Sequence, residues 1–388
     1  MTNANTFADL GLADEIVRAL SAKGITSPFP VQSLTIPDAL EGRDVCGKAK
    51  TGSGKTLAFG LPVLQRMDKA KPNRPTGLVL VPTRELANQV CDELVPAAEA
   101  VGRAALAIYG GAPMEKQIER LGKGIDLVVA TPGRMIDLID RKAVSVAEVQ
   151  HVVVDEADRM ADMGFLPQVE WILRNIESDH QTLLFSATLD GAVNTLIKRY
   201  QTDPTMHEVA SEEVTVEQMT HRFVAVHKMD KPKVAAAIAD NVDRTIMFTR
   251  TKAMADRLAR ELKELGVKAA PIHGDLRQSS REKSLADFSD GKLHTLVATD
   301  VAARGIHVDD VDVVIQYDPP GDHKTYLHRS GRTARAGRTG TAVTMFLWDE
   351  ELQVRQLQRR LGLKLPLHEV FSNDDRLDDL VTWASSQG

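Results

Sequence analysis

The chain has 388 residues, of which 43% are hydrophobic and 26% are charged, and its net charge is −6. This composition excludes a largely disordered chain, and a disulfide scaffold is excluded because Cys46 and Cys91 are the only cysteines. A histone-like basic protein is also excluded, so a nucleic-acid partner would need positive charge gathered on one face. We see no targeting pattern and no apolar stretch of membrane-helix length, so we expect a cytoplasmic protein that does not enter a membrane.

Apolar runs alternate with helical patterns along the first half of the chain. Runs at 44–47, 77–81, 125–130, 152–154 and 182–185 predict buried strands, and the patterns from Leu57 onward and over 84–94 predict helices. The alternation restarts with strands at 244–248, 295–298, 311–316 and 341–347 and a helix over 251–265. Strands that alternate with helices indicate parallel sheets, so we predict an α/β fold with two similar halves.

The domain boundaries follow from composition. The stretch 203–220 is polar and has no long apolar run, so we predict a first domain at 1–208, a linker at 209–220 and a second domain at 221–366. Residues 367–388 are rich in aspartate and glutamate, and we expect them to form a solvated acidic tail.

Residues 49–56 read Ala-Lys-Thr-Gly-Ser-Gly-Lys-Thr between a predicted strand and a predicted helix. This pattern predicts a phosphate-binding loop, although a Gly-rich turn without a ligand is the alternative. Lys55 would neutralise the β- and γ-phosphates, and the Thr56 hydroxyl would bind Mg²⁺. The nucleotide-binding residues predicted in this loop are Thr51, Gly52, Ser53, Gly54, Lys55 and Thr56.

An acidic motif follows the strand at 152–154. Asp155 would hold Mg²⁺, and Glu156 would orient or deprotonate the attacking water. Without a phosphate-binding loop upstream, a solvated acidic turn would be the better interpretation. Ser186 and Thr188 end the next strand, where a turn or a helix cap is the alternative to a functional role.

The segment 328–338 is the densest basic run in the chain. Arg332 and Arg335 are three residues apart, which places them on one face of a helix. Arginines from a second domain stabilise the charge of γ-phosphate transfer and make hydrolysis depend on domain closure. A solvated basic face and a general polyanion patch are the alternatives.

Taken in order, these motifs resemble those of the DEAD-box RNA helicases, which are RNA-dependent ATPases with two tandem RecA-like domains, each a parallel sheet flanked by helices. The resemblance covers about residues 7–350. The motifs that carry it, besides those above, lie at 24–32, 82–87, 110–111, 131–134, 273–281, 298–305 and 328–335.

The resemblance implies further roles. Gln32 would read the adenine edge, Phe7 would stack on the adenine, and Gly305 would contact the nucleotide. Lys55, Asp155, Glu156 and the arginine fingers Arg332 and Arg335 would be catalytic. Residues implied to couple hydrolysis to strand separation are Asp158, Ser186, Thr188 and His328. Residues implied to contact RNA are Pro82, Thr83, Arg84, Gly110, Gly111, Thr131, Pro132, Gly133, Arg134, Gly274, Asp275, Gln278, Arg281 and Thr299.

Four positions depart from the family pattern. Phe29 stands where Thr or Ser is usual, which weakens one contact of the adenine loop, and His307 stands where Asp is usual, so no ribose-binding role is carried onto it. Lys50 replaces the usual Gln and Ala334 the usual Gly.

We therefore predict an RNA helicase that uses ATP and Mg²⁺, closes on RNA with weak sequence specificity, bends one strand and unwinds duplexes locally. We expect a monomer that gains specificity from protein partners. Two alternatives are a DNA-directed translocase of the same superfamily and an RNA clamp or assembly scaffold that uses ATP only to lock shut.

Overall fold

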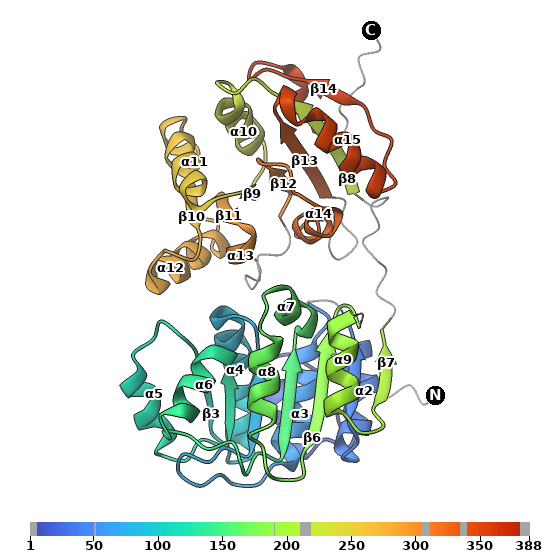
Figure 1. Cartoon of the computed structure of the whole chain (residues 1–388), viewed down its shortest axis with the longest axis vertical. Helices are drawn as coiled ribbons and strands as arrows, with labels where there is room; N and C mark the ends of the chain where they lie inside the picture. Colours follow the sequence, from blue (N-terminus) through green and yellow to red (C-terminus); the bar gives the residue numbers. More distant parts are fainter. Residues whose placement is uncertain are drawn as a thin grey trace. The chain divides into compact units, whose positions relative to one another are not determined.

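The computed structural model describes residues 6–49, 52–189, 191–209, 219–303, 311–333 and 340–380, with the side chains of residues 278 and 301 excepted. Contacts between Cα atoms divide the chain into two compact units, residues 1–211 and 212–388. Each unit is an open α/β sheet covered by helices on both faces (Figure 1). The α/β fold with tandem RecA-like sheets is thus confirmed.

The first unit is built on a sheet of seven parallel strands in the order β3-β4-β2-β5-β6-β1-β7. Its strands are β1 (Val45–Lys48), β2 (Gly77–Leu80), β3 (Ala105–Ile108), β4 (Leu127–Ala130), β5 (His151–Asp155), β6 (Gln181–Ser186) and β7 (Thr205–Glu208). Its helices are α1 (Asp14–Ala22), α2 (Pro30–Leu40), α3 (Lys55–Arg66), α4 (Arg84–Ala100), α5 (Met114–Leu121), α6 (Pro132–Asp140), α7 (Ala157–Asp162), α8 (Leu166–Leu173) and α9 (Gly191–Tyr200).

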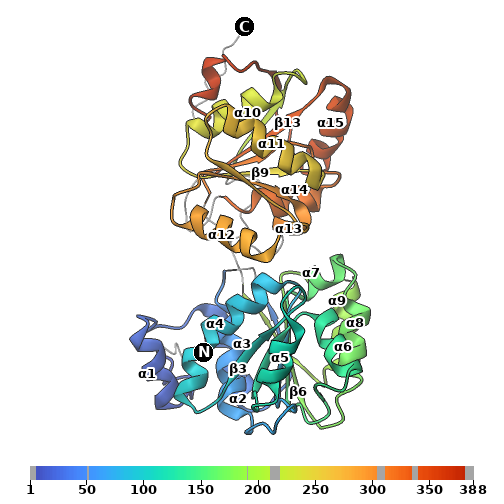
Figure 2. The same cartoon turned by 90° about the vertical axis from the view of Figure 1, so that its left-hand side faces the viewer.

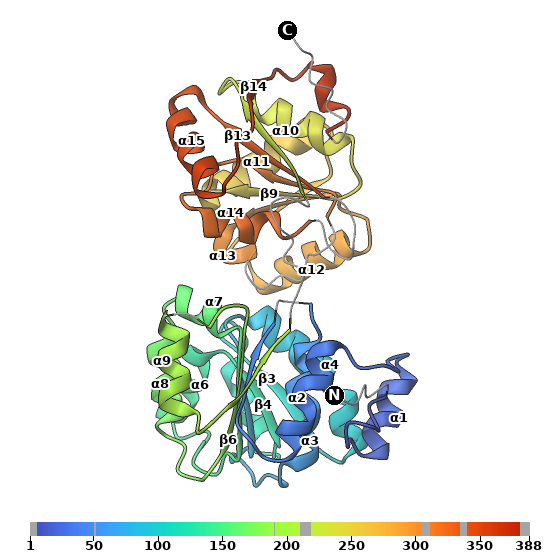
Figure 3. The same ribbon diagram turned by 90° about the vertical axis from the view of Figure 1, so that its right-hand side faces the viewer.

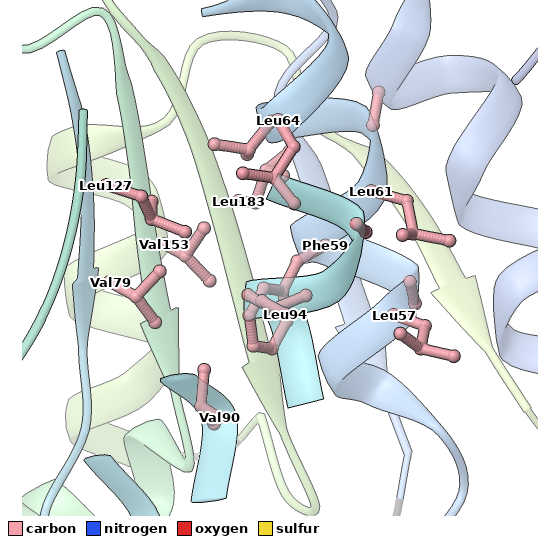
Figure 4. Packing of buried hydrophobic residues seen from close by; sticks show 14 of the residues in the cluster. Leu57, Phe59, Leu61, Leu64, Val79, Val90, Leu94, Leu127, Val153 and Leu183 are labelled. Atoms are coloured by element: carbon pink, nitrogen blue, oxygen red, sulfur yellow. The ribbon is translucent and has the colours of Figure 1, made fainter. Parts of the chain in front are cut away.

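Both faces of this sheet are buried, which explains the near-continuous apolar runs of its central strands. Along β2, Val79 points into one hydrophobic cluster and Leu78 and Leu80 into another. Figure 3 shows α6, α8 and α9 on one side of the sheet and α1 to α4 on the other. In the second of these layers, Phe59 of α3 and Leu94 of α4 pack over the sheet residues drawn in Figure 4.

The second unit repeats the architecture with seven parallel strands in the order β10-β11-β9-β12-β13-β8-β14. Its strands are β8 (Met219–Ala225), β9 (Thr245–Thr249), β10 (Ala269–Ile272), β11 (Thr295–Thr299), β12 (Val313–Gln316), β13 (Gly340–Phe346) and β14 (Leu367–Glu369). Its helices are α10 (Lys231–Asp240), α11 (Lys252–Glu264), α12 (Gln278–Ser289), α13 (Asp300–Ala303), α14 (His323–Ser330), α15 (Glu351–Arg360) and the 3₁₀ turns η2 (Trp348–Glu350) and η3 (Asp375–Leu377). Helices α10 and α11 pack on one face, as Figure 2 shows, and buried residues of α12 to α15 pack on the other.

Two boundaries differ from those expected. The last two residues of the linker placed at 209–220 belong to the second sheet, because β8 begins at Met219. The segment expected as a solvated tail instead adds β14 parallel to β8 and buries Val370, Leu377 and Leu380 in the core. The prediction rested on the acidic residues of this segment and overlooked these apolar side chains, whose burial attaches the segment to the core.

No helix among the described residues combines the length and apolar character needed to cross a membrane.

Candidate functional site

The predicted motifs of the first unit gather at one edge of its sheet, where the strands end. Parallel strands all end at the same edge, and ligands of open α/β sheets bind there. The strand order places the loops after β3, β4 and β2 side by side, followed by those after β5, β6 and β1. The predicted RNA contacts therefore lie along one half of the edge and the predicted phosphate chemistry along the other.

The phosphate-binding loop joins β1 to α3. Gly52 and Gly54 have φ angles of +83° and +86°, a region that favours glycine and lets backbone N–H groups turn inward. Lys55 begins α3, and the positive end of that helix faces the loop. The Lys55 ammonium is buried, 3.1 Å from the carbonyl oxygen of Ala49 and 3.8 Å from Asp155 Oδ1. This arrangement fits a bound phosphate chain.

Asp155 ends β5 beside this loop and is 3% exposed. Burial raises the pKa of its carboxyl to about 6, with Lys55 lowering it and Glu156 raising it further. The carboxylate accepts a hydrogen bond of 2.8 Å from the backbone N–H of Glu156. A buried carboxylate whose nearby cation only partly compensates its charge fits a site for a divalent cation, which prefers oxygen ligands.

Glu156 has a φ of +51°, which is unusual for a residue with a side chain and places its backbone in a strained conformation. Its Oε2 lies 2.6 Å from Nη1 of Arg159, one turn along α7. Arg159 has no assigned role in the sequence analysis. The spacing of three residues between Glu156 and Arg159 is the sequence feature that could have indicated this contact.

Thr56, expected to bind Mg²⁺, has a second partner that the sequence did not indicate. Burial raises the pKa of Glu93 on α4, and a hydrogen bond with the Thr56 side chain lowers it in part. The Thr56 hydroxyl is therefore engaged by a carboxyl group in this structure.

Three of the four residues expected to couple hydrolysis to strand separation, Asp158, Ser186 and Thr188, lie in one network. The backbone N–H of Asp158 donates to Ser186 Oγ at 3.1 Å, and Ser186 Oγ donates to the carbonyl oxygen of Thr188 at 2.6 Å. The N–H of Thr188 donates to Asp158 Oδ2 at 3.2 Å. The ends of β5 and β6 are thereby tied together.

Gln32 lies at the phosphate-binding loop. Its Oε1 accepts from the N–H of Phe29 at 2.8 Å, and its Nε2 donates to the carbonyl oxygen of Gly54 at 2.9 Å. The carboxamide retains one N–H and one lone pair, which are the groups that pairing with an adenine edge needs. Phe7 is 1% exposed and packs in the hydrophobic core, so its stacking on adenine stays a prediction.

The residues expected to contact RNA in the first unit approach one another across three loops. A Cβ atom added at Gly111 would lie 3.1 Å from Arg84 Nη1. Arg134 Nη1 donates to the carbonyl oxygen of Ala112 at 3.1 Å. Thr83 caps α4 by accepting the N–H of Leu86. Residues of the same set that lie at these strand ends are Pro82, Gly110, Thr131, Pro132 and Gly133.

In the second unit, Gly274, Asp275 and Thr299 lie where β10 and β11 end. Lys252 Nζ lies 2.6 Å from Asp275 Oδ1, and this hydrogen bond lowers the pKa of Asp275. Arg281 is buried on α12, which begins at Gln278. The exposed Lys252, which the sequence analysis did not identify, thus balances the charge of Asp275 at this edge.

The basic segment lies partly outside the described residues. His328 is exposed on α14, and Arg332 follows that helix and is half-buried. Arg329, which the sequence analysis did not single out, forms a bidentate pair with Asp300 at 2.6 and 2.8 Å. The residues singled out in the sequence analysis that fall outside the described residues are Lys50, Thr51, Gly305, His307, Ala334 and Arg335.

Comparison with known proteins identifies the family. Residues 29–196 match the family model of the DEAD/DEAH box helicases, and residues 230–337 match that of the helicase conserved C-terminal domain. The chain is 38% identical over 375 residues to the DEAD-box ATP-dependent RNA helicase CshA of Bacillus subtilis, covering 96% of this chain and 76% of that protein. It is 41% identical over 365 residues to the mitochondrial DEAD-box ATP-dependent RNA helicase 9 of Arabidopsis thaliana, covering 92% of this chain but only 59% of the plant protein.

Solved structures agree with this assignment. S. cerevisiae Dbp5 bound to RNA and ADP BeF3 matches with a TM-score of 0.80 and 29% identity, covering 96% of this chain and 97% of that one. A Dbp5 variant bound to a Gle1 variant and IP6 matches with a TM-score of 0.73 and 29% identity, covering 96% of both chains.

Proposed function

Because the chain belongs to the DEAD-box ATP-dependent RNA helicases, which are ATP-hydrolysing enzymes, we propose that it couples ATP hydrolysis to closure of its two units on RNA and to local unwinding. The observation that carries the proposal is the strand order of the first sheet. It puts the loops expected to contact RNA beside the loops expected to bind phosphate, which supports the binding of both ligands at one edge of the sheet.

ATP would bind through the phosphate-binding loop and Gln32. Lys55 would neutralise the β- and γ-phosphates, and Glu156 would align the attacking water. Thr56 and Asp155 would hold Mg²⁺, which supplies further positive charge to the phosphates when bound. Arg332 and Arg335 would stabilise the charge that develops at the γ-phosphate, which makes hydrolysis depend on closure.

RNA would lie along Arg84, Gly111 and Arg134 in the first unit and along Gly274, Asp275 and Thr299 in the second. Contacts from backbone, hydroxyl and basic groups address phosphates and 2′-hydroxyls, so we expect weak sequence preference and strong salt dependence. The Dbp5 complex with RNA supports RNA binding by this chain, and the complex of a Dbp5 variant with a Gle1 variant supports a protein partner. We propose a cytoplasmic monomer.

The test is ATP hydrolysis with and without RNA in wild-type protein and Glu156→Gln. The variant should keep ATP and RNA binding and lose RNA-stimulated turnover, because an amide cannot accept a proton from water. Unchanged stimulated turnover would refute the role of Glu156.

The same assay with DNA of equal length separates an RNA enzyme from a DNA translocase. A duplex-unwinding assay beside an RNA-retention assay separates an unwinding enzyme from a clamp. Slow RNA release without strand separation would contradict the unwinding part of the proposal.

A further inference from the structure

An exposed aromatic ring stands beside the phosphate-binding loop. Phe29 is 57% exposed, one of few large apolar side chains open to solvent among the described residues. A Cβ atom added at Gly54 would lie 2.7 Å from Phe29 Cδ2 and 2.6 Å from Gln32 Nε2. The phenyl ring and the Gln32 carboxamide therefore flank the same glycine of the loop.

The backbone of Phe29 is held in place by its neighbours. Phe29 is the N-cap residue of α2, followed by Pro30 at the first helical position. A phenyl ring cannot accept the hydrogen bond that a Ser or Thr N-cap accepts, and the ring therefore has no role in capping the helix. Instead, Gln32 Oε1 accepts the N–H of Phe29 at 2.8 Å. The same carboxamide thus fixes the residue that carries the ring.

Phe7 offers no comparable surface. It is 1% exposed and packs with Leu10, Leu12 and Ile16 in the core of the first unit. Of these two phenylalanines, Phe29 has the ring face that a planar ligand could cover. Burial of an exposed aromatic face against a nucleobase is favourable, and every base has a face to stack.

We infer that Phe29 stacks on the nucleobase of the bound nucleotide and supplies base affinity, while Gln32 reads the base edge. The inference rests on the proposed function, since it adds an aromatic contact to that nucleotide site. Stacking is tolerant of base identity, whereas edge pairing is not. The two residues therefore divide affinity and selectivity between them.

The test compares binding of ADP, GDP and inorganic tripolyphosphate by calorimetry. Phe29→Ala should weaken ADP and GDP by similar factors of about ten, and Phe29→Leu by nearly as much, because neither presents a π face. Tripolyphosphate binding should stay unchanged. Gln32→Ala should instead reduce the preference for ADP over GDP. The matched control is Phe371→Ala, which removes a phenyl ring that is 50% exposed in the second unit and should leave all three affinities unchanged.

Phe29→Trp adds a direct signal. Its added indole should retain ADP affinity, and its fluorescence, measured against the wild-type background, should change with ADP and not with tripolyphosphate. The inference would be overturned if Phe29→Ala bound ADP within twofold of wild type, or if ADP left the indole fluorescence unchanged. The proposed function would still hold in that case if RNA stimulated ATP hydrolysis by the wild type. Wild-type protein that binds no nucleotide would overturn both.

Discussion

Glu156 Oε2 and Arg159 Nη1 lie 2.6 Å apart, and both side chains are largely buried at the start of α7. The pair joins the residue expected to align water to a cation held on the next helical turn. A buried, charge-assisted hydrogen bond of this kind fixes the carboxylate in one orientation. Arg159 is thus in a position to orient the carboxylate that we propose aligns the attacking water.

We expect Arg159→Ala to lower RNA-stimulated turnover by about tenfold, because a carboxylate that loses its orienting partner aligns water poorly. The nucleotide dissociation constant should change little, since Arg159 lies outside the phosphate-binding loop. Steady-state hydrolysis and nucleotide binding measured on the same preparation check this split, and Arg159→Lys should recover part of the loss. Turnover equal to wild type in Arg159→Ala would show that the pair is only structural.

The Asp300–Arg329 pair should dominate the stability of the second unit. Arg329 is 4% exposed, donates to both Asp300 oxygens and to the carbonyl oxygen of Asp318, and lies 5.1 Å from the ring centroid of Phe248. Asp300→Ala leaves a buried guanidinium without its carboxylate, and we expect a loss of about 3–5 kcal/mol in the free energy of unfolding. Urea unfolding of the wild type and Asp300→Ala, monitored by circular dichroism, measures this loss in the free energy of unfolding.

The exposed pair of Lys292 and Asp290, 2.8 Å apart, is the control for this prediction. Asp290→Ala should cost under about 1 kcal/mol, because solvent screens the interaction. Equal losses in the two variants would contradict the importance given to burial.

Gly60 of α3 packs directly against the side chain of Leu94 on α4. A Cβ atom at this position would lie 2.2 Å from Cδ2 of Leu94, whose side chain is labelled in the hydrophobic cluster of Figure 4. We expect Gly60→Ala to lower the free energy of unfolding by about 1–3 kcal/mol through overpacking, although alanine favours a helix. Adding Leu94→Val should restore part of this loss, which a double-mutant cycle measures.

Gly133 provides the opposite case on α6. A Cβ atom there meets no heavy atom within 4 Å, so Gly133→Ala should be neutral or stabilising. A destabilisation by Gly133→Ala as large as that of Gly60→Ala would show that helix backbone effects, and not the contact with Leu94, set the cost.

Most inner strands could be predicted from the sequence, whereas the four edge strands, and the inner strand β8 next to the edge strand β14, could not. The order of the sheets puts β3, β7, β10 and β14 at their edges, and none of these was predicted. Edge strands are only partly covered, and β7 (Thr-Met-His-Glu) and β14 (Leu-His-Glu) accordingly lack the continuous apolar run that marks a buried strand. β7 alternates between half-buried and exposed residues, and β10 contains Pro271, which is confined to positions of this kind.

Only some residues of the candidate site could likewise be predicted from the sequence. The phosphate-binding loop is contiguous in sequence, so its residues could be found by pattern alone. Glu93 beside Thr56 and Lys252 beside Asp275 could not, because each partner comes from a separate element that only the fold brings near. The sequence indicates only that Phe29 weakens one contact of the adenine loop. The exposure of its ring and its position against Gly54 are what indicate a surface for a ligand.

His151 makes the stability of the first unit depend on pH. It begins β5, is 5% exposed and lies with Nδ1 3.0 Å from Gln181 Oε1. Burial lowers the pKa of His151 below its ordinary value of 6.5, with the Gln181 hydrogen bond opposing the shift. Between the folded and unfolded pKa values the unfolded chain binds more protons, so the free energy of unfolding should fall as pH falls below about 6.5. Urea unfolding at pH 7.5 and 5.5 measures this loss, and His151→Gln, which cannot take up a proton, should lose less stability between the two values than wild type. An identical pH dependence in both proteins would mean that other groups carry it.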